Sequence, residues 1–193
     1  MDRRQALALL AAAAALAACG EKKPQFSAVD LTGADYAKDF ALPDASGKTR
    51  TLQDFKGRAV IVFFGYTQCP DVCPTTLAEI AQAKKLLGPD GDKVQGVFIT
   101  VDPERDTPEL LKAYMVNFGP DFVALRGTPE QVAALAKDFK VYFKKVEGKT
   151  PGSYTMDHSA ASFVYDPQGR LRLYTRYGSG AQALAGDLKQ LLS

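Results

Sequence analysis

A continuous apolar run at residues 59–65 constrains the fold of this chain more than any other feature. It reads Ala-Val-Ile-Val-Phe-Phe-Gly and is rich in β-branched and aromatic residues. A strand exposed on one side alternates apolar with polar residues, whereas this run has no polar face. We therefore predict a strand that is covered on both faces, inside a sheet with helices packed against it.

The rest of the chain alternates between strand and helix patterns. Further strands are expected at 94–101, 122–125, 162–165 and 171–174, and helices at 74–87, 107–119, 128–139 and 181–192. Two of these helices open with Thr-Pro, in which the threonine caps the helix and the proline takes its first position. Strands alternating with helices form mostly parallel sheets, and the late hairpin adds an antiparallel edge. We predict an α/β protein with a central mixed sheet flanked by helices, an order compatible with a thioredoxin-like domain carrying an insertion and also with other small α/β sheets.

Cys69 and Cys73 follow directly on the first apolar strand. Open α/β sheets place their ligands at the carboxyl ends of strands, so this is where a site is expected. Each cysteine precedes a proline, and a residue before proline disfavours the helical conformation. We expect both cysteines in a loop and Pro74 at the start of the helix, whose dipole lowers the pKa of nearby thiols. The pair suits either metal capture or a reversible disulfide.

His158 is the only histidine in the chain, and it lies shortly before the expected strand at 162–165. If that strand neighbours the strand at 59–65, the loop carrying His158 faces the cysteines, and His158 is a candidate metal ligand with Asp157 as a candidate to orient it. The alternative is a surface or core histidine with no role in metal binding.

Two thiolates and an imidazole form a soft donor set, which is typical of sites for Cu(I) or zinc. An iron–sulfur cluster needs about four cysteine ligands, more than this chain contains. A structural zinc site would need a fourth ligand, for which Asp71 or Asp157 is available. Copper fits the donor set best, because Cu(I) accepts two or three soft ligands.

The N-terminus has the pattern of an export signal. Two arginines at positions 3 and 4 precede an apolar run at 6–18 that is too short to cross a bilayer and ends in small residues before Cys19. This resembles the lipobox of bacterial lipoproteins, and an ordinary cleaved signal is the alternative. We expect a signal peptide at 1–18, lipidation at Cys19, a tether at 19–39 and a domain at 40–193. The protein is expected in the cell envelope, on the periplasmic side, anchored to the membrane by lipid.

Charge and cysteine content narrow the function classes. The formal net charge is only +2, and no run of basic residues appears, so nucleic-acid binding is excluded. The chain has 3 cysteines, one of them at the lipobox. A disulfide between Cys69 and Cys73 would close too small a loop to stabilise much, which favours chemistry over structure for this pair.

Three segments together resemble the Sco/SenC family of copper chaperones: 64–75 with the two cysteines, 100–108, and 157–159 with the histidine. The resemblance implies a thioredoxin-like fold and copper bound by Cys69, Cys73 and His158. It also implies a role in assembling the dinuclear copper site of cytochrome c oxidase subunit II, with that subunit or its assembly factors as partner. We expect a metallochaperone and not a turnover enzyme.

Two other activities stay open for the cysteine pair. In a thiol–disulfide oxidoreductase, Cys69 and Cys73 would form a redox-active disulfide that keeps partner cysteines reduced. A peroxidase would need an arginine beside a peroxide-reactive cysteine.

Overall fold

A computed structural model describes residues 24–193 of the chain. Cys19 and the expected signal peptide lie outside these residues. The strands are β1 Val29–Asp30, β2 Leu42–Pro43, β3 Thr49–Arg50, β4 Ala59–Gly65, β5 Val94–Thr100, β6 Val123–Leu125, β7 Phe143–Glu147, β8 Tyr154–His158, β9 Ser162–Tyr165 and β10 Leu171–Thr175. The helices are η1 Leu52–Phe55, α2 Val72–Leu86, η2 Gly88–Lys93, α3 Pro108–Met115, α4 Pro129–Asp138 and α5 Ala181–Leu192.

The main sheet has six strands in the order β1-β10-β9-β4-β5-β6. β4, β5 and β6 run parallel, while β9 is antiparallel to β4 and β10 is antiparallel to β9. The sheet is therefore mixed, and the predicted α/β class is confirmed. β9 also lies directly beside β4, as the placement of His158 required.

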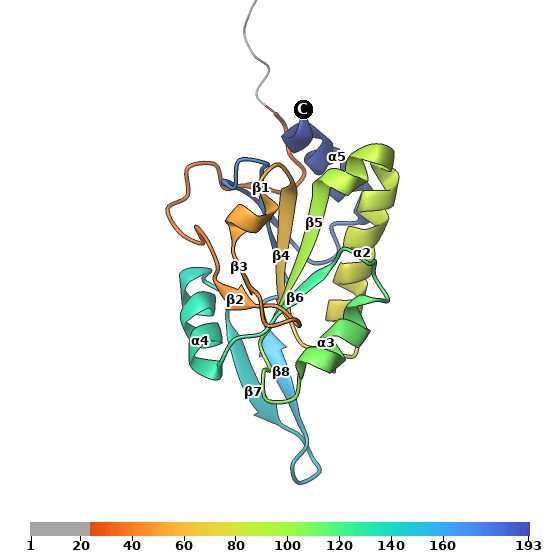
Figure 1. Ribbon diagram of the computed structural model, residues 1–193. Helices are drawn as coiled ribbons and strands as arrows, with labels where there is room; N and C mark the ends of the chain where they lie inside the picture. The colour runs from red at the N-terminus through yellow and green to blue at the C-terminus, as the bar shows by residue number, and fades with distance from the viewer. Residues whose placement is uncertain (1–23) are drawn as a thin grey trace, which may run out of the picture.

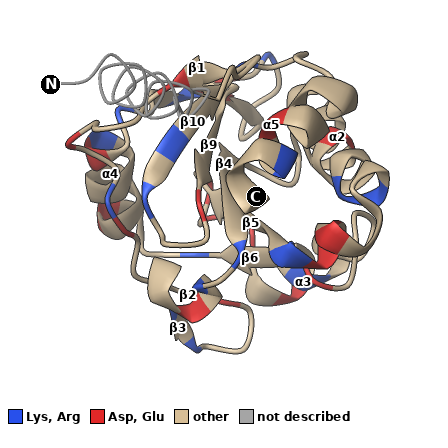
Figure 2. Cartoon of the chain, turned by 90° about the horizontal axis from the view of Figure 1, so that it is seen from above, with Lys and Arg blue, Asp and Glu red and all other residues tan. Residues whose placement is uncertain are grey.

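β4 is buried along its whole length, as predicted from its uniform apolar sequence. Figure 2 shows α4 on one side of the sheet and α2, α3 and α5 on the other. On the α4 side, Phe139 packs edge-on against Phe64 of β4 with ring centroids 5.2 Å apart. On the other side, Phe63 of β4 packs against Phe98 of β5 at 6.2 Å. Successive residues of β4 thus point to opposite faces of the sheet and contribute to two apolar layers.

The N-terminal part of the domain differs from the prediction. We expected a tether at 19–39, but β1 pairs with β10, and the backbone N–H groups of Ser27 and Ala28 donate to the two carboxylate oxygens of Asp187 on α5. Asp187 is only 2% exposed. The many polar residues of this segment hid a short edge strand, although Phe26, Leu31 and Tyr36 pack against the core. The expected domain start at residue 40 therefore lies inside the folded region.

The helix α3 is shorter than expected. It starts at Pro108, with the Thr107 hydroxyl accepting from the Leu110 N–H as predicted, but it ends at Met115 and not near residue 119. Asn117 and Phe118 instead donate to carbonyls three residues earlier, the tighter pattern that often ends an α-helix.

The structure also contains a hairpin that we did not predict. β7 and β8 form a two-stranded antiparallel sheet of their own. Figure 1 shows this hairpin extending beyond the main sheet at the end where α2 begins, opposite the C-terminus. Most of its residues are exposed, so the apolar signal that marks the central strands is weak here. Within the described part of the chain, none of the helices is long and apolar enough to span a lipid bilayer.

Candidate metal centre

The two cysteines lie where β4 turns into α2. Cys69 is in the connecting loop, as predicted, with its N–H donating to the Tyr66 carbonyl over 3.3 Å. Cys73 is not in the loop, because α2 begins at Val72 and not at Pro74. N–H groups in the first turn of a helix have no intrahelical partner, so a proline fits there without loss of a hydrogen bond. The Cys73 N–H instead points to the Cys69 sulfur, 3.4 Å away.

His158 is the last residue of β8, and not part of a loop as we expected. It pairs with Phe143 across the hairpin. Its ring meets the rings of Phe63 and Tyr66 edge-on, each with a centroid separation of 5.9 Å. One face of β8 carries the Tyr154, Met156 and His158 side chains, and this alternation is the signal from which the strand could have been found.

The three predicted ligands come together. The Cys73 sulfur lies 3.3 Å from Nε2 of His158, and one donor atom from each of Cys69, Cys73 and His158 lies within 4.8 Å of the others. Donor atoms around one metal ion, with bonds of about 2.0–2.3 Å, are separated by about 3.5–4 Å. The arrangement therefore has the size of a single metal site.

Hydrogen bonding leaves Nε2 of His158 free to bind a metal ion. Nδ1 lies 3.0 Å from the backbone carbonyl oxygen of Ser159, which can only accept, so Nδ1 carries the proton. Nε2 then has a free lone pair and faces the Cys73 sulfur. Asp157 was one candidate to orient the ring, but its side chain is exposed and the Ser159 backbone carbonyl holds Nδ1 instead.

The two thiols have opposite electrostatic environments. The pKa of Cys69 is lowered, first by the hydrogen bond from the Cys73 side chain and further by the backbone N–H groups of Cys73 and Asp71. The pKa of Cys73 is raised, because its thiol donates to Cys69 and because it is buried. Cys73 is 0% exposed, while Cys69 and His158 are half-buried. Cys69 is therefore the thiolate, and it is the sulfur that an incoming partner reaches first.

A buried carboxylate fixes the cysteine loop to the end of β5. Asp106 is fully buried and accepts hydrogen bonds from the Thr67 backbone N–H at 3.1 Å, the Thr67 hydroxyl at 2.5 Å and the Thr100 hydroxyl at 2.5 Å. Burial raises the pKa of this carboxyl group. From the sequence we predicted no functional residue in the segment 102–107. The charged residues of this segment directly follow a buried strand, at the end of the sheet that bears the cysteines. This position could have marked Asp106 as a candidate.

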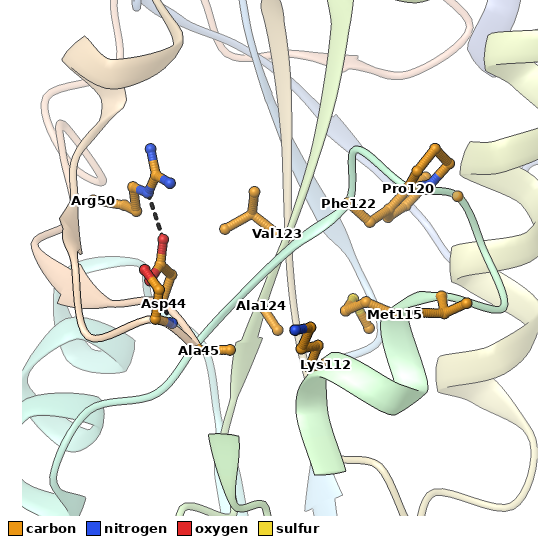
Figure 3. Close-up of a pocket in the computed structure, with 12 residues that line it drawn as sticks. Asp44, Ala45, Arg50, Lys112, Met115, Pro120, Phe122, Val123 and Ala124 are labelled. Carbon is orange, nitrogen blue, oxygen red and sulfur yellow. Dashed lines mark hydrogen bonds and ion pairs between the residues drawn. The ribbon is translucent and has the colours of Figure 1, made fainter. Parts of the chain in front are cut away.

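The metal centre lies apart from a surface pocket of the same domain. A surface pocket of about 400 Å³ lies elsewhere, between the β2–β3 hairpin, β6 and α3, and none of the three ligands lines it. Figure 3 shows its walls, with the Asp44–Arg50 ion pair on one side and Met115 and Lys112 on the other. The donor atoms of the metal centre instead lie between a loop, a helix start and a hairpin, which suits ligand exchange with another macromolecule.

Comparison with known proteins agrees with these features. The SCO1/SenC family model matches residues 29–193. The SCO2-like protein of Rickettsia felis is 36% identical over 133 residues, covering 68% of this chain and 65% of that protein. The chain thus spans slightly less than two thirds of that relative's length.

Solved structures extend the similarity to the whole domain. The structure of Bradyrhizobium japonicum ScoI with copper bound is 44% identical, with a TM-score of 0.72 over 80% of this chain and 98% of that one. Apo Sco1 of Thermus thermophilus is 38% identical, with a TM-score of 0.77 over 87% of this chain and 98% of that one. The predicted thioredoxin-like fold is confirmed, and the chain belongs to the SCO1/SenC family.

Proposed function

We propose that this protein binds copper through Sγ of Cys69, Sγ of Cys73 and Nε2 of His158, and delivers it to the dinuclear copper site of cytochrome c oxidase subunit II. The observation that carries the proposal is the convergence of these three donor atoms within 4.8 Å, from segments far apart in the sequence. Two thiolates and an imidazole are soft donors that favour copper, and ScoI, similar over the whole domain, is known with copper bound.

The environment of each sulfur supports transfer as well as binding. Copper requires both sulfurs as thiolates, so binding displaces the proton that Cys73 holds, and copper affinity rises with pH. Cys69, half-buried, is accessible to the thiolates of an acceptor protein, whereas Cys73 is enclosed. Exchange of ligands one at a time, starting at Cys69, would pass the ion on without releasing it into solution.

Copper titration of the reduced protein tests the proposal. Wild type should bind one equivalent of Cu(I), and one of Cu(II) with thiolate-to-copper charge-transfer absorption. His158→Ala and Cys69→Ser should each weaken binding by at least tenfold, since each removes a donor. Transfer is then measured by incubating the loaded protein with the soluble copper domain of subunit II. Copper binding that is unchanged by both substitutions would refute the site, and failure of transfer would refute the delivery step alone.

A second candidate function is thiol–disulfide exchange, which the cysteine pair itself favours. Cys69 has a lowered thiol pKa and partial exposure, which suits attack on a partner's disulfide, and Cys73 lies beside it to resolve the mixed disulfide. His158 separates the two functions. His158→Ala should retain reduction of a disulfide substrate if the role is redox, while copper binding falls.

We also propose that the protein is exported and attached to the membrane by lipid at Cys19, with the metal centre on the periplasmic side. The support is the charged start, the short apolar run and the small residues before Cys19. Metabolic labelling with a fatty acid tests this. Label should enter the wild-type protein and not Cys19→Ser, and equal labelling of both would refute the assignment.

A further inference from the structure

His158 and the cysteines belong to separate sheets. The cysteines follow β4 of the main sheet, whereas His158 ends β8 of the two-stranded β7–β8 sheet. No strand ladder joins the two sheets in the part of the chain that the structure describes. The distance between the imidazole and the sulfurs therefore depends on the short link from His158 to β9 and on the side-chain contacts that dock the hairpin.

Arg105, in the loop between β5 and α3, makes the most direct of these contacts. Its Nη1 donates to the carbonyl oxygen of Tyr154 at 2.9 Å and to Oε1 of Gln68 at 3.1 Å. Its guanidinium group also stacks 3.5 Å from the centroid of the Tyr154 ring. Tyr154 is the first residue of β8, and Gln68 directly precedes Cys69. One side chain thus touches both segments that supply metal ligands.

Asp102 completes the arrangement from the same loop. It is 3% exposed, forms an ion pair with Nε of Arg105, and accepts a hydrogen bond from the Tyr154 hydroxyl at 2.8 Å. Arg105 and Tyr154 are therefore each held by Asp102 and by one another. A guanidinium group fixed by several directed bonds loses little further freedom on forming each one, which makes it a stiff connector.

We propose that Asp102, Arg105 and Tyr154 form a clamp that holds the β7–β8 hairpin so that His158 stays within bonding reach of the two cysteine sulfurs. The three are positioning residues, and their role in metal binding depends on the copper function proposed above. Without the clamp, the hairpin spends only part of its time in the binding geometry, and the apparent affinity falls by that fraction. A docked population of about one tenth would weaken binding about tenfold.

Copper affinity of Arg105→Gln is the first test, measured by competition with a Cu(I) chelator on the reduced full chain. We expect about tenfold weaker binding. Lys145→Gln is the matched control, because it also removes a cation near Tyr154, 3.9 Å from its ring centroid. Within residues 24–193, the ion pair of Lys145 is with the exposed Glu104, so the loss of Lys145 should change affinity less than twofold. Equal loss in both variants would refute the clamp.

The same measurement in the His158→Ala background shows which ligand the clamp acts on. If Arg105 works by positioning His158, then Arg105→Gln should cost almost nothing once the imidazole is gone. An undiminished tenfold loss would overturn the proposal. If Arg105→Gln does not fold, Tyr154→Phe replaces it in the same cycle, since it keeps the stacked ring and removes only the bond to Asp102.

Amide hydrogen exchange of the metal-free protein tests the clamp without copper. Exchange in β8 should be faster in Arg105→Gln than in wild type, and unchanged in Lys145→Gln. Equal protection in all three proteins would refute the clamp. A wild-type protein that binds no copper would refute the proposed function, while the exchange data would still decide whether the clamp holds the hairpin.

Discussion

Replacing Gly65 by alanine tests how tightly the fold encloses the buried sulfur. Gly65 is the last residue of β4, and a Cβ added there would lie 2.7 Å from the Cys73 sulfur, 2.8 Å from the Phe98 ring and 3.0 Å from the Phe63 ring. Ordinary contacts between such atoms are about 3.5–4 Å, so the sulfur would have to move by about 1 Å. β4 cannot yield easily, because it is paired with β5 on one side and β9 on the other.

Two quantities should change in Gly65→Ala. Overpacking of a buried site costs about 1–3 kcal/mol in the free energy of unfolding. A metal site tolerates ligand displacements of only about 0.2 Å, so a shift of about 1 Å should weaken copper binding by at least tenfold. Urea unfolding of the reduced, metal-free protein measures the first effect, and competition with a Cu(I) chelator measures the second.

Gly186→Ala is the matched control for this experiment. Gly186 lies within α5 and an added Cβ would meet nothing within 4 Å, so alanine should leave copper affinity unchanged and stabilise the helix by up to about 1 kcal/mol. If Gly65→Ala were as stable as wild type and bound copper equally well, the inference that Cys73 is held rigidly against β4 would be wrong.

Two further substitutions each remove a carboxylate that accepts several hydrogen bonds. Asp187→Ala should lower the free energy of unfolding by about 2 kcal/mol, since it removes a buried carboxylate that accepts hydrogen bonds from the Ser27 and Ala28 N–H groups. Amide hydrogen exchange around β1 should become faster, and unchanged exchange there would contradict this assignment. For Asp44, burial raises the pKa, but hydrogen bonds from Ser46 and Arg50 outweigh it and lower the pKa to about 2. Because the folded-state pKa lies below the unfolded value of 3.8, this stabilisation is present above about pH 4 and is lost as pH falls through about 2. Asp44→Asn should therefore be less stable than wild type at pH 7 by urea unfolding, with a gap that narrows towards pH 2; a constant gap would refute the assignment.

The local elements were largely predictable, because each depends on residues that are neighbours in sequence. The uniform apolar run predicted β4 with its correct bounds, and Thr107 and Thr128 were correctly expected to cap their helices. The start of α2 was missed by two residues, since a proline in the first turn of a helix costs no intrahelical hydrogen bond and Pro74 therefore lies inside the helix. The β7–β8 hairpin was missed because β7 is mostly exposed and carries little hydrophobic pattern, and the alternation along β8 is short.

The donor residues of the site could be chosen from the sequence, because Cys69, Cys73 and His158 are all the cysteines and histidines that the domain contains. What only the tertiary structure decided is how they meet. Cys73 and His158 are 85 residues apart in the chain, and their contact arises from the pairing of β4 with β9 and the docking of a separate hairpin. The Arg105 contacts belong to that docking, and the hydrogen bonds from Thr67 and Thr100 to Asp106 join the cysteine loop to the end of β5. Such contacts join distant segments, and no local periodicity records them.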